Sequence, residues 1–160
     1  MSELKALYEE LGYNAVQTYL QSGNVVFSSA DKVAAHGRRI QEAIAGRLGL
    51  MVPVLVLSKE RFAKLATLKP VFHGTDIDEA FLHVTFLFEA PKLDFPSDAL
   101  PKSEGEAAVF REGHVYVYCP HGYGRTKLNN SYFERKLKTL ATTRNWRTVQ
   151  ALYLLSMAER

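Results

Sequence analysis

The chain has 160 residues, 47% of them hydrophobic and 23% charged, which is the composition of an ordinary globular protein. Its single cysteine, Cys119, excludes an internal disulfide and a zinc site built from several thiolates. No apolar run approaches the ~20 residues of a membrane-spanning helix. Residues 1–11 have the pattern of an amphipathic helix rather than of a signal peptide, so we expect a cytoplasmic protein.

The first half of the chain predicts a helix, a hairpin, a second helix, a strand and a third helix. Residues 2–11 have apolar side chains at helical spacing, and the extended run 16–27 contains a turn signal. Asp31 is expected to cap a helix that Gly49 ends. The apolar run 52–57 is typical of a strand buried on both faces. The third helix is expected to begin at Ser58 and end before Pro70.

The second half begins after residues 69–78, which lack periodicity and predict a boundary. A strand is expected over 81–88, a loop with a helical turn over 91–104, and a second hairpin over 107–118. Alternation along its second strand places residues on two faces. One face holds Val115, Val117 and Cys119, and the other holds His114, Tyr116 and Tyr118.

Two helices complete the prediction. Ser131 and Glu134 have the spacing of a capping box, which predicts a helix start at Ser131. In this helix the apolar and basic residues fall on opposite faces. The apolar face holds Phe133, Leu137 and Leu140, and the basic face holds Arg135, Lys136 and Lys138. The last helix is expected to turn Trp146, Val149, Tyr153 and Met157 inward.

The order of these elements predicts an α+β protein with two tandem ferredoxin-like (α/β plait-like) subdomains, residues 1–75 and 76–160. A plait of this kind normally begins with a strand in the middle of its sheet, whereas this chain begins with a helix. The absence of a central strand leaves its two neighbours with unpaired edges. We therefore expect that the first subdomain lacks its initial strand and that Met1 is an internal methionine of a longer protein.

Three motifs resemble those of the bacterial family named domain of unknown function 1697. They are residues 18–27 (Thr-Tyr-Leu-Gln-Ser-Gly-Asn-Val-Val-Phe), residues 118–130 (Tyr-Cys-Pro-His-Gly-Tyr-Gly-Arg-Thr-Lys-Leu-Asn-Asn) and residues 141–149 (Ala-Thr-Thr-Arg-Asn-Trp-Arg-Thr-Val). The resemblance extends over essentially the whole chain. It implies two plait-like subdomains and a cytoplasmic bacterial protein, and it implies no activity. Members usually begin with a strand reading roughly Leu-Leu-Arg-Gly-Ile-Asn, which is absent here.

Positive charge is concentrated at the end of the chain. From His121 onward there are eight Lys or Arg residues and two acidic ones, a net charge of +6, against −3 for the first 120 residues. The asymmetry indicates either a surface that meets an anion or one solvated basic helix. Glycines allow backbone amides to approach an anion near a helix N-terminus. The candidate anion-binding residues are Gly122, Gly124, Arg125, Lys127, Arg135, Lys136, Arg144, Trp146 and Arg147.

Other patterns are less specific. Tyr116 and His114 lie on one face of an expected open sheet, where they could stack bases or simply pack against a helix. Cys119 and His121 could form a nucleophile and base, but a lone cysteine among valines is usually a buried hydrophobe. The five histidines have no metal-ligand spacing, so we expect no metal and no cofactor.

The sequence therefore favours a non-enzymatic protein that binds nucleic acid or a phosphate-bearing molecule through its basic C-terminal surface. Two alternatives stay open. One is an enzyme acting on a small phosphorylated or carboxylated metabolite, with the glycine loop as the anion site. The other is a scaffold whose basic helix meets an acidic protein partner.

Overall fold

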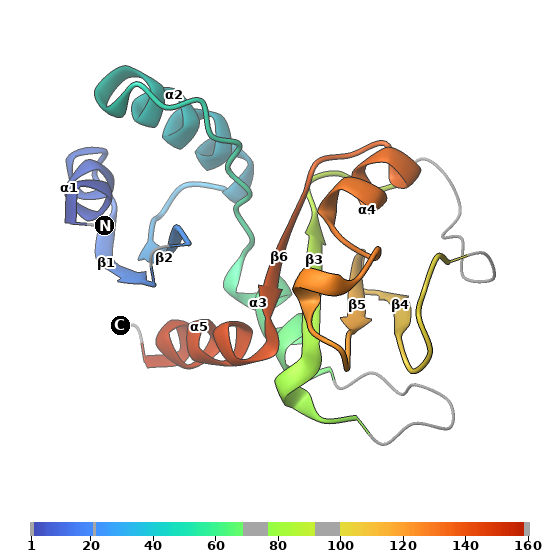
Figure 1. The fold of residues 1–160 in the computed structure, drawn as a ribbon. Helices are drawn as coiled ribbons and strands as arrows, with labels where there is room; N and C mark the ends of the chain where they lie inside the picture. The colour runs from blue at the N-terminus through green and yellow to red at the C-terminus, as the bar shows by residue number, and fades with distance from the viewer. Residues whose placement is uncertain (1, 21, 69–76, 92–99, 159–160) are drawn as a thin grey trace. The chain divides into compact units, whose positions relative to one another are not determined.

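A computed structural model describes residues 2–20, 22–68, 77–91 and 100–158. These residues have a mixed α/β fold with five α-helices and two antiparallel sheets (Figure 1). They form two compact units, residues 1–63 with 151–160 and residues 64–150. The expected division at residue 75 differs from this one because the C-terminal residues join the first unit and the end of the third helix joins the second.

The first unit begins with α1 (Ser2–Glu10), which Gly12 ends with a positive φ of 93°. An antiparallel hairpin follows, formed by β1 (Asn14–Tyr19) and β2 (Asn24–Ser28). The predicted helix and hairpin are thus confirmed. Together with α2 (His36–Leu48), these elements enclose one apolar cluster. Its buried members are Leu7, Tyr8, Tyr13, Val16, Ile40 and Ile44.

The second helix begins later than predicted. A 3₁₀ turn occupies Val33–Ala35, and α2 itself begins at His36 without a side-chain cap. The His36 ring is buried, and its Nδ1 lies 2.8 Å from the Tyr13 hydroxyl. The side chain of Asp31 therefore does not start the helix. The predicted end is confirmed, because Gly49 adopts a left-handed conformation there.

The predicted strand over 52–57 is wrong. Residues 50–57 have no assigned secondary structure and join neither sheet of the described residues. Their apolar character reflects packing, since Val54 and Val56 lie against the apolar cluster of the first unit. The following helix, α3 (Lys59–Thr67), begins as predicted, because the Ser58 hydroxyl accepts from the Arg61 amide at 3.2 Å. Pro70 lies outside the described residues.

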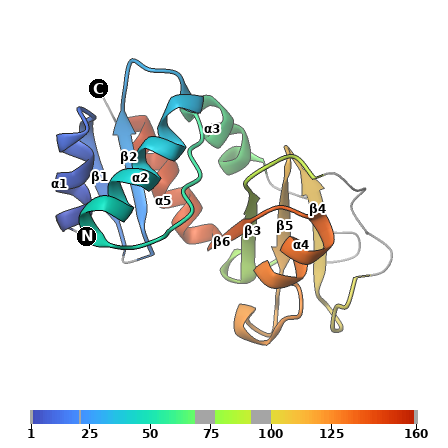
Figure 2. The same ribbon diagram turned by 90° about the horizontal axis from the view of Figure 1, so that it is seen from above.

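The second unit is built on a four-stranded antiparallel sheet with strand order β4-β5-β3-β6 (Figures 1 and 2). The strands are β3 (Leu82–Leu87), β4 (Ala107–Arg111), β5 (His114–Tyr118) and β6 (Ala141–Asn145). The strand and hairpin expected between residues 81 and 118 are confirmed. Most of the loop expected over 91–104 lies outside the described residues. The edge strand β6 was not predicted.

The two faces of this sheet are covered differently. On one face, α4 (Asn130–Leu137) packs on the side chains of Val115, Val117 and Cys119, as their alternation predicted. On the other face, the Tyr116 hydroxyl donates to the carbonyl of Leu65 in α3 at 2.7 Å. The last helix, α5 (Trp146–Ala158), begins beside that tyrosine, with ring centroids of Tyr116 and Trp146 6.2 Å apart.

Candidate anion-binding surface

In the glycine loop between β5 and α4, some backbone amides donate hydrogen bonds to carbonyls of the loop itself. Gly122 has a φ of 99°, which a residue with a side chain rarely adopts, and a 3₁₀ turn follows at Tyr123–Arg125. The Gly122 amide donates to the Cys119 carbonyl at 3.0 Å, and the Arg125 amide donates to the Gly122 carbonyl at 3.2 Å. The amides of Gly122 and Arg125 are therefore already paired inside the loop.

The helix after this loop, α4, begins at Asn130, one residue before the predicted start. Asn129 is the N-cap of α4, and its side-chain oxygen accepts from the Tyr132 amide at 3.0 Å. The predicted capping box is wrong, because Ser131 is exposed within the first turn and Glu134 bonds elsewhere. The Glu134 carboxylate accepts from the Ala141 amide at 2.9 Å, so this side chain joins α4 to the start of β6.

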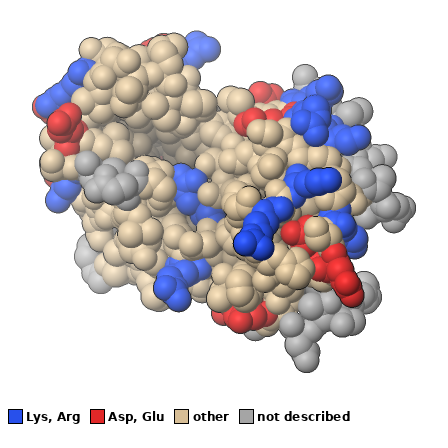
Figure 3. Space-filling model, in the orientation of Figure 1, with Lys and Arg blue, Asp and Glu red and all other residues tan. Residues whose placement is uncertain are grey.

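Four of the predicted cations belong to the glycine loop and to α4. Arg125 and Lys127 extend from the loop, and Arg135 and Lys136 extend from the exposed side of α4. All four are exposed, and none forms an ion pair with the described residues. We call these four residues the loop–α4 surface. Figure 3 shows Lys and Arg side chains on the face that carries α4, with acidic side chains between some of them.

Arg144 and Trp146 do not join this surface. Arg144 lies on the opposite face of the sheet from α4, because its neighbour Thr143 faces the α4 side. The Arg144 guanidinium donates to the Thr142 hydroxyl at 2.7 Å, and burial lowers its pKa. Trp146 is only 6% exposed. Arg147 is exposed in the first turn of α5.

A polar cluster under the glycine loop escaped the sequence analysis. The Thr143 hydroxyl lies 2.5 Å from the Asn130 side-chain oxygen and 2.8 Å from the Thr85 hydroxyl, and it accepts from the Tyr123 hydroxyl at 3.2 Å. The Tyr123 ring stacks on His83 with centroids 4.9 Å apart. This cluster joins the loop and α4 to β3 and β6. Only knowledge of the β3–β6 pairing could have revealed it.

Cys119 and His121 do not form a nucleophile and base. Cys119 is fully buried, and burial raises the pKa of its thiol to about 11. His121 is exposed, and its Nε2 lies 2.9 Å from the Glu104 carbonyl oxygen. A thiol with this pKa is protonated near neutral pH and is a poor nucleophile.

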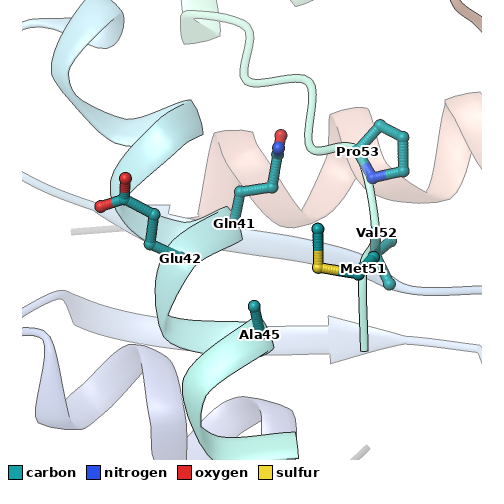
Figure 4. Close-up of a pocket in the computed structure, with 6 residues that line it drawn as sticks. All are labelled: Gln41, Glu42, Ala45, Met51, Val52 and Pro53. Carbon is teal, nitrogen blue, oxygen red and sulfur yellow. The ribbon is translucent and has the colours of Figure 1, made fainter. Parts of the chain in front are cut away.

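A small cavity of about 250 Å³ is found in the first unit. It is lined by Gln41, Glu42 and Ala45 of α2 and by residues 51–53 of the segment that follows (Figure 4). None of the predicted anion-binding residues contributes to it. Within the described part of the chain, no three His, Cys, Asp or Glu side chains are grouped as metal ligands.

The described helices are all too short or too polar to cross a membrane. Among curated proteins, none matches this sequence. The chain is similar in structure to a conserved bacterial protein, SP0830 from Streptococcus pneumoniae, with a TM-score of 0.70 and 23% sequence identity. That match covers 98% of this chain and 88% of the other, and it shows the fold alone.

The family model described as "Protein of unknown function (DUF1697)" matches residues 1–118. The first of the three resembling motifs lies inside the matched range. The motif over 141–149 lies beyond it, and the motif over 118–130 lies beyond it except for its first residue. The matched range nevertheless covers most of the sequence, and the chain therefore belongs to the DUF1697 family.

Proposed function

We propose that this protein binds nucleic acid through the loop–α4 surface, by contacts with backbone phosphates. The observation that carries the proposal is the exposure of four cations, Arg125, Lys127, Arg135 and Lys136, without ion pairs to the described residues. Residues 121–150 contain seven Lys or Arg residues and one acidic residue. Such a concentration of positive charge attracts a polyanion and releases its counterions.

The chemistry of this surface favours contacts with phosphates over recognition of bases. Base stacking needs exposed aromatic faces, but Tyr116 is fully buried and Trp146 is 6% exposed. The loop amides of Gly122 and Arg125 donate to carbonyls of the loop itself. What is left is a set of long cationic side chains, which contact the phosphates of many sequences about equally well.

We also infer that the second unit is a ferredoxin-like plait. Numbered within this unit, its strands follow the order 2-3-1-4, and neighbouring strands are antiparallel, as in that plait. In this arrangement α4 is the crossover helix between β5 and β6. The helix therefore presents its outer side to solvent, and Arg135 and Lys136 lie on that side.

The proposal is tested by measuring the binding of fluorescent single-stranded and duplex oligonucleotides over a range of salt concentrations. The wild-type chain should bind both probes, with affinity falling as salt rises. A variant with Arg125, Lys127, Arg135 and Lys136 all replaced by alanine should lose most of this affinity. For duplex DNA, the slope of log K against log salt should become less steep by about 3 to 4.

The matched control replaces Arg38 and Lys59, two exposed cations of the first unit, by alanine. This double variant should keep the wild-type salt slope to within about 1. The proposal fails if the wild-type chain binds neither probe at low salt. It also fails if the control variant loses as much affinity for each charge removed as the loop–α4 variant does.

A further inference from the structure

One cation of the loop–α4 surface, Arg135, lies over an aromatic ring. Its guanidinium carbon is 5.8 Å from the centroid of the Tyr132 ring, which is within the range of a cation–π contact. Tyr132 lies three residues before Arg135 on α4, and long side chains of a helix lean back over the preceding turn. The helix geometry therefore favours this contact. Among the described residues, no ring lies beneath Arg125, Lys127 or Lys136 in this way.

The Tyr132 ring is held in place by the core of the second unit. The side chain is 5% exposed and belongs to the apolar cluster between α4 and the sheet. Its ring also contacts the Phe133 ring edge-on, with centroids 5.1 Å apart. A ring that is close-packed in a core keeps one orientation on average. The attraction therefore favours those conformations of Arg135 in which the guanidinium lies over this ring.

This restriction of the Arg135 side chain matters for the binding of a phosphate. A long side chain that becomes ordered on binding loses rotamer freedom, and the loss weakens association. For Arg135, part of that freedom is already lost in the free protein, because the ring favours one region of space. A guanidinium stacks on a ring with its face, while its N–H groups lie in its plane and stay available to phosphate oxygens.

We propose that Tyr132 is a positioning residue, which holds the Arg135 guanidinium ready for a backbone phosphate and makes Arg135 the principal anchor of nucleic acid on the loop–α4 surface. This inference rests on the proposed function and adds which cation the binding depends on most. Tyr132 acts through Arg135, because its own hydroxyl is buried and has no hydrogen-bond partner among the described residues. The ring is therefore the part of this side chain that matters.

The first test compares Arg135→Lys with Arg125→Lys in the binding of a fluorescent duplex oligonucleotide. Lysine keeps the charge but lacks the planar group that stacks on a ring and donates two parallel hydrogen bonds. Both variants lose the donors of a guanidinium, whereas only Arg135→Lys also loses the stacking on Tyr132. We expect the affinity to fall about two- to fivefold further for Arg135→Lys than for Arg125→Lys. Both positions are exposed, so neither variant should disturb the fold.

The second test changes the ring itself. Tyr132→Phe keeps the ring and removes only the unpaired hydroxyl, so this variant should bind like the wild type. Tyr132→Leu keeps an apolar side chain without a ring, and we expect about two- to fivefold weaker binding. In an Arg135→Ala background, Tyr132→Leu should have no further effect, because the two residues act as a pair. A general loosening of α4 would weaken binding in either background.

A measurement on the free protein separates this inference from the proposed function. By NMR, the ring current of residue 132 should shift the Arg135 δ protons upfield in the wild type and in Tyr132→Phe. Unshifted protons in the wild type overturn the inference, whether or not the chain binds nucleic acid. Equal losses for the two lysine variants, or a loss from Tyr132→Leu that persists beside Arg135→Ala, overturn it while the binding of nucleic acid stands. No binding by the wild type removes the proposed function and this inference with it.

Discussion

The two units contain similar elements, yet among the described residues only the second unit has a sheet of more than two strands. In the second unit, β3 pairs with β5 on one side and with β6 on the other, and Leu82 and Val84 on this strand are fully buried. In the first unit, the described ladder ends at β2, although Val54 and Val56 pack on the apolar cluster of that unit. The comparison teaches that side-chain burial and backbone pairing are separate requirements, and that a chain can satisfy the first without the second.

The largest expected difference is in amide hydrogen exchange of the free chain. Amides of β3 should exchange only when the sheet opens, whereas the amides of Leu55 and Leu57 should exchange through small local motions. Because opening free energies approach the global stability in core strands, we expect the two sets of rates to differ by about a thousandfold or more. The measurement is residue-resolved exchange by NMR. Similar rates in the two stretches would show that residues 50–57 are paired after all.

The next largest effect comes from the same truncation in both units. Val117→Ala removes two methyl groups from a fully buried position in β5, and we expect a loss of about 2–3 kcal/mol in the free energy of unfolding. Val56→Ala acts at a half-buried position, where the loss should be about 1 kcal/mol or less. Chemical denaturation followed by circular dichroism gives both values.

The control for this pair is Val33→Ala, since Val33 is 38% exposed and lies in the 3₁₀ turn before α2. Its effect should be within about 0.5 kcal/mol of zero. Equal losses for Val117→Ala and Val56→Ala would contradict the comparison. They would mean that the unpaired segment is packed as tightly as a strand of the complete sheet.

Local signals in the sequence predicted the two hairpins well. The wrong strand over 52–57 and the missed strand β6 both depend on non-local pairing, which these signals do not contain. The turn of the second hairpin places Glu112 and Gly113 at positive φ, and a two-residue turn of this kind is encoded by the residues themselves. The apolar run 52–57 predicted a strand buried on both faces, but Val52 is 41% exposed, residues 54–57 are half-buried, and a ladder also needs a partner, which the run does not encode. The strand β6 was missed because it is polar and short, and only its pairing with β3 extends it.

The prediction of the candidate site was wrong in part for the same reason, because the pairing of β6 with β3 was not predicted. Helical periodicity placed Arg135 and Lys136 opposite the apolar face of α4, and both are exposed. Arg144 was grouped with them because it is close in sequence. In a strand, however, alternate residues point to opposite faces, so the turn of Thr143 toward α4 directs Arg144 to the other side of the sheet. Without β6, this separation could not be foreseen.

A smaller effect should distinguish the predicted and observed starts of α4. Asn129→Ala removes the oxygen that accepts from the Tyr132 amide, and we expect a loss of about 1 kcal/mol in the stability of the second unit. Ser131→Ala changes an exposed residue in the first turn and should be within about 0.5 kcal/mol of wild type. Because Trp146 belongs to the second unit, its fluorescence during denaturation reports both values. A larger loss of stability for Ser131→Ala than for Asn129→Ala would support Ser131 as the helix cap.

The smallest expected effect is a pH dependence that arises inside the complete sheet. Burial on β3 lowers the pKa of His83 below its ordinary value of 6.5, although the Phe81 carbonyl opposes part of that change. The folded state therefore binds this proton less readily than the unfolded state. As pH falls from above 6.5 to below the folded pKa, the unfolded chain gains the proton first, and the free energy of unfolding decreases.

His83→Gln should remove this contribution while keeping a polar side chain next to Tyr123. We expect the wild-type chain to lose more stability than the variant between about pH 7.5 and pH 5.5, as measured by denaturation followed through Trp146 fluorescence. An NMR titration of the His83 ring checks the cause independently. An equal loss in both chains, or a ring that titrates above 6.5, would show that the half-buried position next to Tyr123 does not disfavour the charged imidazole. The polar cluster under the glycine loop would then be more open to water than the contacts of Thr143 and Tyr123 imply.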